Sequence, residues 1–368
     1  MYRKETIETV KACRFCFMCR HVCTIGNVTR SESNTPRGFG LLTDKSIMRP
    51  DAFTDKNFID TMYECTLCSA CRSHCVSSYD VPGFVRAARA EIVAAGNAPD
   101  SVRALAKRII DTGNVFGEKT SRFAKIPSLK RASRADVLLY IGSYAAYRVP
   151  EMAEAAIKIF NAAKISFAVI EDEIDTGKAL YNLGSIDEAK TAAKHIVQAI
   201  RDSGAKTVVT LCPSDYDALK NDYPAFGLSL GEVAVEHSSN FYQRLLKEKK
   251  ISIKKRRTEK LVFIDSDYLS KYNENGADAR AIASAIGDIV EVGTNREESY
   301  AALEGGVVYQ LIQPKLGTRV IECAASKIAE AGKGIVVTAS PISFVTLSGA
   351  KDIGPITAID TLLAQAIS

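Results

Sequence analysis

The chain has 368 residues, of which 46% are hydrophobic and 25% are charged, as in soluble globular proteins of two or three domains. No apolar stretch reaches the length of a membrane span, and the charged start MYRKETIETVKACRFC does not resemble a secretory signal. We therefore expect a cytoplasmic protein, with a peripheral position at the inner face of the membrane left open. In the cytoplasm thiols stay reduced, so clustered cysteines are metal ligands rather than disulfides.

The net charge of +5 is unevenly distributed. Residues 1–134 carry 22 Lys and Arg against 13 Asp and Glu, an excess of nine positive charges, and the rest of the chain is acidic. A basic, cysteine-rich segment suits an acidic protein partner or an anionic cofactor. Nucleic acid is not an expected partner, because no nucleic-acid-binding motif is recognisable.

Two cysteine runs share one spacing. CRFCFMCRHVC at 13–23 and CTLCSACRSHC at 65–75 both read C-x2-C-x2-C-x3-C, and together they hold eight of the ten cysteines. Three closely spaced thiolates can ligate the iron atoms at three corners of an iron–sulfur cube. The iron at the fourth corner needs a ligand from another part of the chain. The last cysteine of each run then ligates the cluster of the other run.

Crossed ligation predicts two 4Fe–4S clusters. The first cluster takes Cys13, Cys16, Cys19 and Cys75. The second takes Cys65, Cys68, Cys71 and Cys23. Such bonds tie the two runs together, so we expect this part of the chain to fold only around its metal.

Other interpretations of the runs are weaker. Structural zinc prefers two C-x2-C pairs with a longer gap between them, and a disulfide framework does not suit a protein without a secretion signal. One feature departs from the usual pattern, since Thr24 and Val76 follow the runs where proline is common. His21 and His74 lie inside the runs, where either could tune a cluster, although an ordinary, partly exposed loop position is the simpler interpretation.

The segments around and after the runs are predicted to be helical. KNFIDTMYEC precedes the second run, and VPGFVRAARAEIVAAG follows it with Asp80 as a cap and Pro82 in the first turn. SVRALAKRIIDTG carries an apolar stripe and ends at Gly113. We expect a helical, ferredoxin-like two-cluster domain over 1–98 and a helical linker over 99–133.

From residue 134 the pattern becomes α/β. Buried strands are predicted at 135–143, 164–172 and 205–212, with alanine-rich amphipathic helices between them. The scheme then restarts: 260–269 corresponds to the first strand, and GIVVTASPISFVTL at 334–347 corresponds to TVVTLCPSDYDAL at 207–219. This internal repeat of about 115 residues predicts two duplicated lobes, 134–250 and 251–368. The fold class is α+β and multidomain.

The chain resembles the cysteine-rich-domain (CCG) iron–sulfur proteins. These include the iron–sulfur subunits of anaerobic glycerol-3-phosphate dehydrogenase and glycolate oxidase, and heterodisulfide reductase subunits. The resemblance covers nearly the whole chain and is carried by TPRGFGLL, CTLCSACRSHC, KALYNLGSIDEA, TLCPSDYDALKNDYP and NREES. It implies a helical two-cluster domain followed by two CCG-like lobes.

The lobes depart from the family pattern, in which each lobe carries five cysteines. In the first lobe only Cys212 remains, and the other four positions hold Ser143, Asp175, Thr176 and Asp215. In the second lobe the five positions hold Asp267, Ala301, Ala302, Ser340 and Ser343. One thiolate does not hold a cluster, so a third, catalytic cluster is not expected. Cys212 and Cys323 are interpreted as packed residues, and the lobe aspartates as solvated loop carboxylates.

These observations predict a non-catalytic electron-transfer subunit of an oxidoreductase complex. Electrons would come from a flavoprotein partner that carries FAD: a hydroxy-acid or glycerol-phosphate dehydrogenase, or an electron-transfer flavoprotein. They would go to a further carrier or membrane quinone. No dinucleotide fingerprint or phosphate-binding loop is present in this chain. A catalytic subunit of the heterodisulfide reductase type is the alternative, and a structural scaffold is a third possibility.

Overall fold

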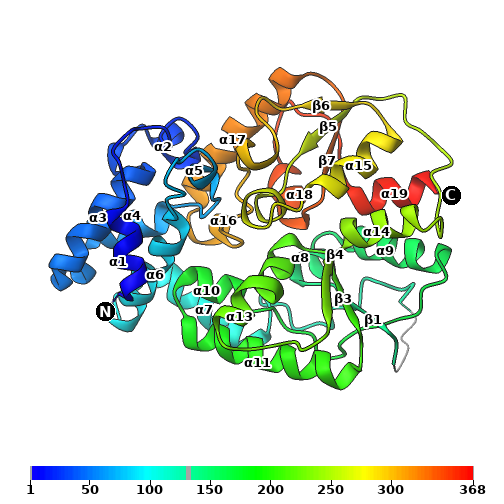
Figure 1. Cartoon of the computed structure of the whole chain (residues 1–368), viewed down its shortest axis with the longest axis horizontal. Coiled ribbons are helices and arrows are strands. Elements are labelled where there is room, and N and C mark those ends of the chain that lie inside the picture. Colours follow the sequence, from blue (N-terminus) through cyan, green and yellow to red (C-terminus); the bar gives the residue numbers. More distant parts are fainter. Residues whose placement is uncertain (1, 130–133, 368) are drawn as a thin grey trace.

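The structure is a computed structural model of the chain and describes residues 2–129 and 134–367. A group of helices is followed by two small parallel sheets with helices around them, which confirms the α+β class (Figure 1). Within the described ranges, no helix combines the length and apolar character needed to cross a membrane.

The N-terminal part is helical. Its elements are α1 (Lys4–Lys11), α2 (Thr24–Thr29), η1 (Glu32–Asn34), α3 (Pro36–Met48), η2 (Pro50–Thr54), α4 (Lys56–Glu64), α5 (Ala70–Ser73), α6 (Val81–Ala94) and α7 (Asp100–Thr112). Asp80 caps α6 by accepting a hydrogen bond from the Gly83 N–H at 3.2 Å, and Pro82 lies in the first turn. Gly113 ends α7 with a φ of 69°, which favours glycine. Both helix ends agree with the sequence-based expectation.

The first sheet has the strand order β2-β1-β3-β4, with every neighbouring pair parallel. Its strands are β1 (Val137–Tyr140), β2 (Phe167–Ala168), β3 (Thr207–Thr210) and β4 (Ala234–His237). Its helices are α8 (Ser143–Tyr147), α9 (Pro150–Ala162), α10 (Lys178–Leu183), α11 (Ile186–Ser203), α12 (Pro213–Asp217), η3 (Ala218–Asp222), α13 (Tyr223–Ala225) and α14 (Ser238–Lys247).

The second sheet repeats this order as β6-β5-β7-β8, again parallel throughout. Its strands are β5 (Leu261–Ile264), β6 (Ile289–Glu291), β7 (Ile335–Thr338) and β8 (Ile356–Ala358). The other elements are η4 (Tyr268–Tyr272), α15 (Ala277–Ile286), η5 (Arg296–Glu298), α16 (Tyr309–Ile312), α17 (Pro314–Ala331), α18 (Pro341–Leu347) and α19 (Ile359–Ala366).

A common strand order is what a duplicated unit produces. The division into 1–98, 99–133, 134–250 and 251–368 stays a prediction, and residues 130–133 of the predicted linker lie outside the described residues.

Three expectations about the strands need correction. The strand predicted at 164–172 spans only Phe167–Ala168. The segment 260–269 is a strand only over Leu261–Ile264, and a helical turn follows at Tyr268–Tyr272, where Lys271 pairs with Asp267 at i,i+4 spacing. Strands β4, β6 and β8 were not predicted. Each lies at a sheet edge and is short and only partly buried, so it has no clear apolar alternation.

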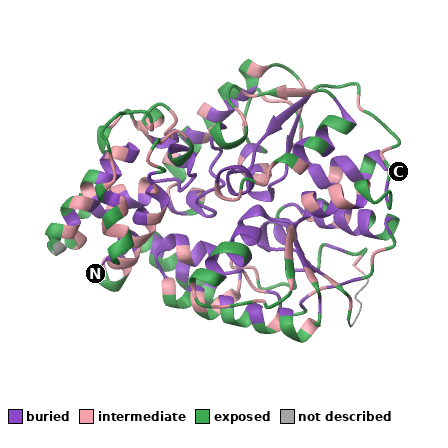
Figure 2. Ribbon diagram, viewed as in Figure 1, coloured by how far each residue is buried: buried purple, intermediate pink, exposed green. Residues whose placement is uncertain are grey.

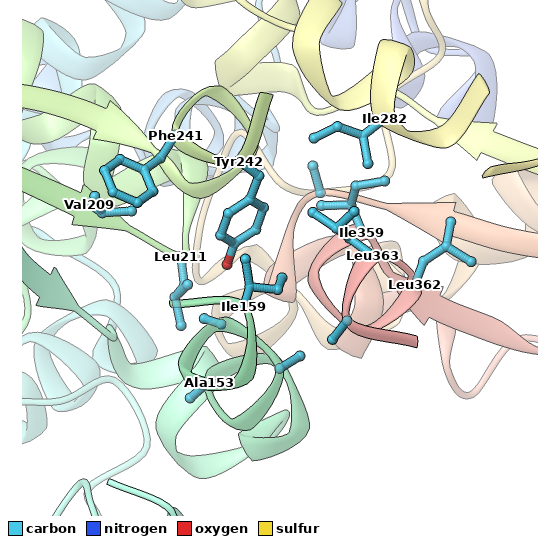
Figure 3. Close-up of a cluster of buried hydrophobic side chains, with 14 of the residues drawn as sticks. Ala153, Ile159, Val209, Leu211, Phe241, Tyr242, Ile282, Ile359, Leu362 and Leu363 are labelled. Carbon is cyan, nitrogen blue, oxygen red and sulfur yellow. The ribbon is translucent and has the colours of Figure 1, made fainter. Parts of the chain in front are cut away.

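The two lobes share one hydrophobic core. Figure 3 shows side chains of β3, α9 and α14 facing those of α15 and α19, and they all belong to one buried cluster. Helix α19 packs against α9 of the first lobe and α15 of the second. The Tyr242 hydroxyl donates to Asp360 at 2.8 Å across this contact. Buried residues are also found in the N-terminal helices, where they form a second apolar cluster that includes Cys65 and Cys71 of the second run (Figure 2).

Candidate metal centre

Each cysteine run forms a loop between helices of the N-terminal part. The first run lies between α1 and α2, and the second lies between α4 and α6 and includes the short helix α5. All ten cysteines are free thiols. Two sets of thiols lie near one another: Cys13, Cys16 and Cys75 are close to Cys19, and Cys23, Cys65 and Cys68 are close to Cys71.

The first group contains Cys13, Cys16, Cys19 and Cys75. Burial raises the pKa of Cys19 to about 11, and the other three thiols of the group lie close enough to raise it further. Cys16 is exposed and its three companions are partly buried, so this group reaches the protein surface.

The second group contains Cys65, Cys68, Cys71 and Cys23. Burial raises the pKa of Cys71 well above its ordinary value, and the other three thiols raise it further. Cys19 of the first group has the same effect, so the two groups are neighbours. Cys65, Cys68 and Cys71 are buried, which places this group in the interior.

The second group is enclosed by residues distant in sequence. The Tyr272 hydroxyl donates to the Leu67 carbonyl at 2.6 Å, and the Tyr309 hydroxyl donates to the Glu64 carbonyl at 2.9 Å. Arg89, on α6, donates to the Cys65 carbonyl at 2.7 Å. The cysteine loop is therefore held between α6 and the second lobe.

Both loops have the same unusual backbone. Phe15 and Phe17 in the first loop have φ values of 56° and 62°, and Leu67 and Ser69 at the equivalent positions have 51° and 63°. Side chains other than glycine rarely adopt this region, and it persists only where the surroundings enforce it. Left-handed residues alternating with others turn successive N–H groups inward, which creates a concave site for anions, including iron–sulfur clusters.

Backbone N–H groups also point at the thiols. The N–H groups of Phe15 and Leu67 donate to the sulfurs of Cys13 and Cys65, both at 3.5 Å. The Gly26 N–H donates to the Cys23 sulfur at 3.4 Å. Such donors stabilise thiolates and the negative charge of a cluster.

The donor set and backbone fit a cluster of the 4Fe–4S type, with four thiols in each group. A single metal ion draws its ligands closely together, whereas a cluster keeps them apart by its own width. Within 2–129 and 134–367, no three His, Cys, Asp or Glu side chains are arranged to hold a single ion.

His21 and His74 pack edge to face between the loops, with ring centroids 5.1 Å apart.

The carboxylates of the first lobe are not solvated, contrary to expectation. Asp175 pairs with Arg122 at 2.9 Å and accepts a hydrogen bond from Ser143. Asp215 is buried and accepts from the Thr176 hydroxyl at 2.8 Å. Burial, and after it the nearby Asp175, raises the pKa of Asp215 to about 7. Sequence alone did not show this burial, because the partners lie about 30 to 50 residues away.

The second lobe holds an equivalent buried network. Asp267 accepts from Lys271 at 2.5 Å and from the Gly305 N–H at 3.1 Å. Glu304, which the sequence did not single out, accepts from the Ser266 hydroxyl at 2.8 Å. Burial, and after it Asp267, raises the pKa of Glu304 to about 7. Paired polar groups thus occupy the family's cysteine positions at Asp175, Asp215 and Asp267.

The two remaining cysteines lie outside both groups. Cys212 is buried, 3.1 Å from the Ser214 hydroxyl, and packs in the apolar cluster that includes Tyr144. Cys323 is partly buried and accepts from the Tyr300 hydroxyl at 3.3 Å. Both positions agree with packed residues.

Arg89 is the main supporting residue that sequence reasoning missed. Its guanidinium is buried and also donates to the carbonyls of Met62 at 2.9 Å and Asn182 at 2.8 Å. The available signal was an arginine inside the apolar stretch VPGFVRAARAEIVAAG. A buried arginine needs carbonyl or carboxylate partners, but a single sequence does not identify them.

The chain is similar to several known iron–sulfur oxidoreductases. It is 26% identical over 309 residues to the D-type subunit of the dihydromethanophenazine:CoB–CoM heterodisulfide reductase of Methanosarcina acetivorans, a match of 81% of this chain and 75% of that protein. It is 24% identical over 263 residues to the EtfAB:quinone oxidoreductase of Syntrophomonas wolfei, and 28% identical over 229 residues to the probable iron-sulfur-binding oxidoreductase FadF of Bacillus subtilis.

The last two matches cover 67% and 60% of this chain but only 36% and 31% of those proteins, so the chain spans about a third of their length. No protein-family model matches the chain. The relatives are iron–sulfur oxidoreductases, which confirms the resemblance seen in the sequence. The chain is thus related to the iron–sulfur subunits of oxidoreductases and is similar to the cysteine-rich-domain family.

Proposed function

We propose that this chain is an electron-transfer subunit that holds two 4Fe–4S clusters. Cys13, Cys16, Cys19 and Cys75 would ligate the first, and Cys65, Cys68, Cys71 and Cys23 the second. When bound, the clusters supply one-electron oxidation and reduction. The observation that carries the proposal is the gathering of eight thiols into two adjacent groups of four, on loops whose N–H groups point at sulfur.

The different exposure of the two groups supports a relay. Around the first group the surface is apolar: Phe15, Phe17, Met18 and Val76 are all at least half exposed. Exposed Arg14 lies within the same loop. An apolar patch with basic residues fits a protein partner of opposite charge. The second group is buried and closed off from water, so the first group is the point of contact with a partner.

The partner in this proposal is a flavoprotein that carries FAD. One relative is named an EtfAB:quinone oxidoreductase, and an electron-transfer flavoprotein would suit this chain as a donor. A membrane quinone or a further carrier would accept the electrons, which would place the chain at the inner face of the membrane. The chain itself supplies thiol ligands and a docking face, while the flavin belongs to the partner.

A purified, anaerobically prepared protein tests the proposal. We expect about eight irons per chain, and reduced-state electron paramagnetic resonance (EPR) signals from two 4Fe–4S clusters. The protein should accept electrons from photoreduced flavin and pass them to ferricyanide, and Cys68→Ala should impair this transfer. Four irons or fewer in the wild-type chain, or unimpaired transfer by the variant, would contradict the proposal.

A second candidate is a catalytic subunit of the heterodisulfide reductase type. It is favoured by the match to the heterodisulfide reductase of Methanosarcina acetivorans, which covers more of both proteins than the other two matches reported above. Such a catalytic protein would need a third metal centre, and the buried polar residues at the lobe positions argue against one. Clearly more than eight irons, with an extra paramagnetic signal after oxidation, would favour this candidate.

A further inference from the structure

The two thiol groups differ in the hydroxyl groups around them. Two hydroxyl residues are neighbours in sequence of cysteines of the second group. Thr24 directly follows Cys23, and Ser69 lies between Cys68 and Cys71. Both Thr24 and Ser69 are about 1% exposed. Neither the Thr24 nor the Ser69 hydroxyl has a hydrogen-bond partner among the residues that the structure describes.

A buried hydroxyl without a partner is costly and needs an explanation. Ser69 is one of the left-handed residues of its loop, and Thr24 is the first residue of α2. A third hydroxyl, that of Thr66, is a hydrogen-bond partner of the Cys68 sulfur. Each of these three buried hydroxyl residues directly follows a candidate ligand of the second cluster: Thr24 follows Cys23, Thr66 follows Cys65 and Ser69 follows Cys68.

The first group has no hydroxyl at the equivalent positions of the runs. Arg14 corresponds to Thr66, Phe17 to Ser69 and Val76 to Thr24. Phe17 is 50% exposed and Val76 is 86% exposed. The two runs share spacing and backbone but differ at all three of these positions.

We propose that Thr24 and Ser69 donate hydrogen bonds to the second cluster and raise its reduction potential. The inference rests on the proposed function, because it requires both clusters. Reduction adds negative charge to a cluster, so a hydroxyl donor binds the reduced form more strongly than the oxidised form. The low dielectric of the interior strengthens this effect. A higher reduction potential at the second cluster favours electron transfer from the exposed first group to the buried second group.

The experiment measures both reduction potentials in the full chain, by potentiometry followed by EPR. Thr24→Val and Ser69→Ala remove one hydroxyl each with little change of shape. Each should lower the reduction equilibrium constant of one cluster about tenfold, which is about 59 mV for a one-electron couple, and leave the other cluster unchanged. The signal that is lost in Cys65→Ser identifies which cluster is the second one.

Two controls separate tuning from a structural effect. Thr24→Ser keeps the hydroxyl and should keep the potential. Ser73 lies in the same run, but its hydroxyl already donates to the Glu297 carbonyl at 2.6 Å, so Ser73→Ala should leave both potentials unchanged.

The outcomes are distinguishable. Thr24→Val and Ser69→Ala proteins with about eight irons and unchanged potentials would overturn this inference and leave the proposed function intact. If Ser69→Ala fails to hold the second cluster, the isosteric Thr24→Val decides alone. A wild-type chain without two clusters would overturn the proposed function and this inference with it.

Discussion

Gly305 of the second lobe lies directly against the second cysteine loop, and its replacement tests how the loop and the lobe depend on each other. A Cβ at this position would lie 2.4 Å from the Leu67 carbonyl oxygen and 2.5 Å from the Cys68 Cα, whereas ordinary contact begins near 3.4 Å. The backbone would have to move by about 1 Å to accept it. Gly305 is fixed on its other side by the hydrogen bond to Asp267, and its carbonyl accepts from Tyr268 at 2.7 Å.

We expect Gly305→Ala to displace the cysteine loop rather than its own segment. Overpacking of this kind costs about 1–3 kcal/mol. The urea slope increases with chain size, and at about 3 kcal/mol/M the unfolding midpoint should fall by roughly 0.3–1 M. The displaced loop should also lose the second cluster, so the iron content should fall from about eight to about four per chain.

Urea unfolding followed by circular dichroism, together with iron analysis and EPR, measures both effects. Gly349→Ala is the matched control, because a Cβ there meets no atom within 4 Å. A Gly305→Ala protein with the wild-type iron content and midpoint would refute the view that the second lobe closes tightly over this loop.

Three further outcomes are expected. Arg89→Met leaves three buried carbonyls without their donor, so the free energy of unfolding measured in urea should fall by about 3–5 kcal/mol. An unchanged urea midpoint would contradict the role of Arg89 as a support of the second cysteine loop. Asp215 has a folded pKa of about 7, above its unfolded value near 4, so its ionisation lowers stability as pH rises from about 4 to 7. Asp215→Asn should therefore gain stability over wild type as pH rises from about 4 to 7 in urea unfolding, and a constant difference over this range would contradict this. With crossed ligation, Cys75→Ser and Cys13→Ser should lose the same EPR signal, and Cys65→Ser the other; loss of one signal by both Cys75→Ser and Cys65→Ser would disprove crossing.

Local signals in the sequence predicted the helices well. Asp80, Pro82 and Gly113 mark helix ends because caps and left-handed turns depend on neighbouring residues. The buried strands of both sheets were recognisable from apolar runs, whereas the three missed edge strands, such as Ala234–His237, lack such a run because they are only partly buried.

The candidate ligands were also readable, because thiol spacing is a local property. The residues that surround these ligands could not be predicted from the sequence. Tyr272 and Tyr309 contact the second cysteine loop from more than 200 positions away. The burial of Asp215 depends on packing between elements that a single sequence does not pair. Sequence thus pointed to the candidate ligands, whose role stays a prediction, but showed neither the enclosure of the second group nor the polar network of the lobes.

The enclosure of the second thiol group has a consequence for biogenesis. The first run and Cys75 are complete once about 75 residues have been synthesised, and this group stays open to the surface. The pocket of the second group is sealed by Gly305 and Tyr309, which are translated more than 200 residues later. We therefore expect iron insertion at the inner position to come before the C-terminal lobe docks, so that a chain that folds without iron would have to reopen before it could mature.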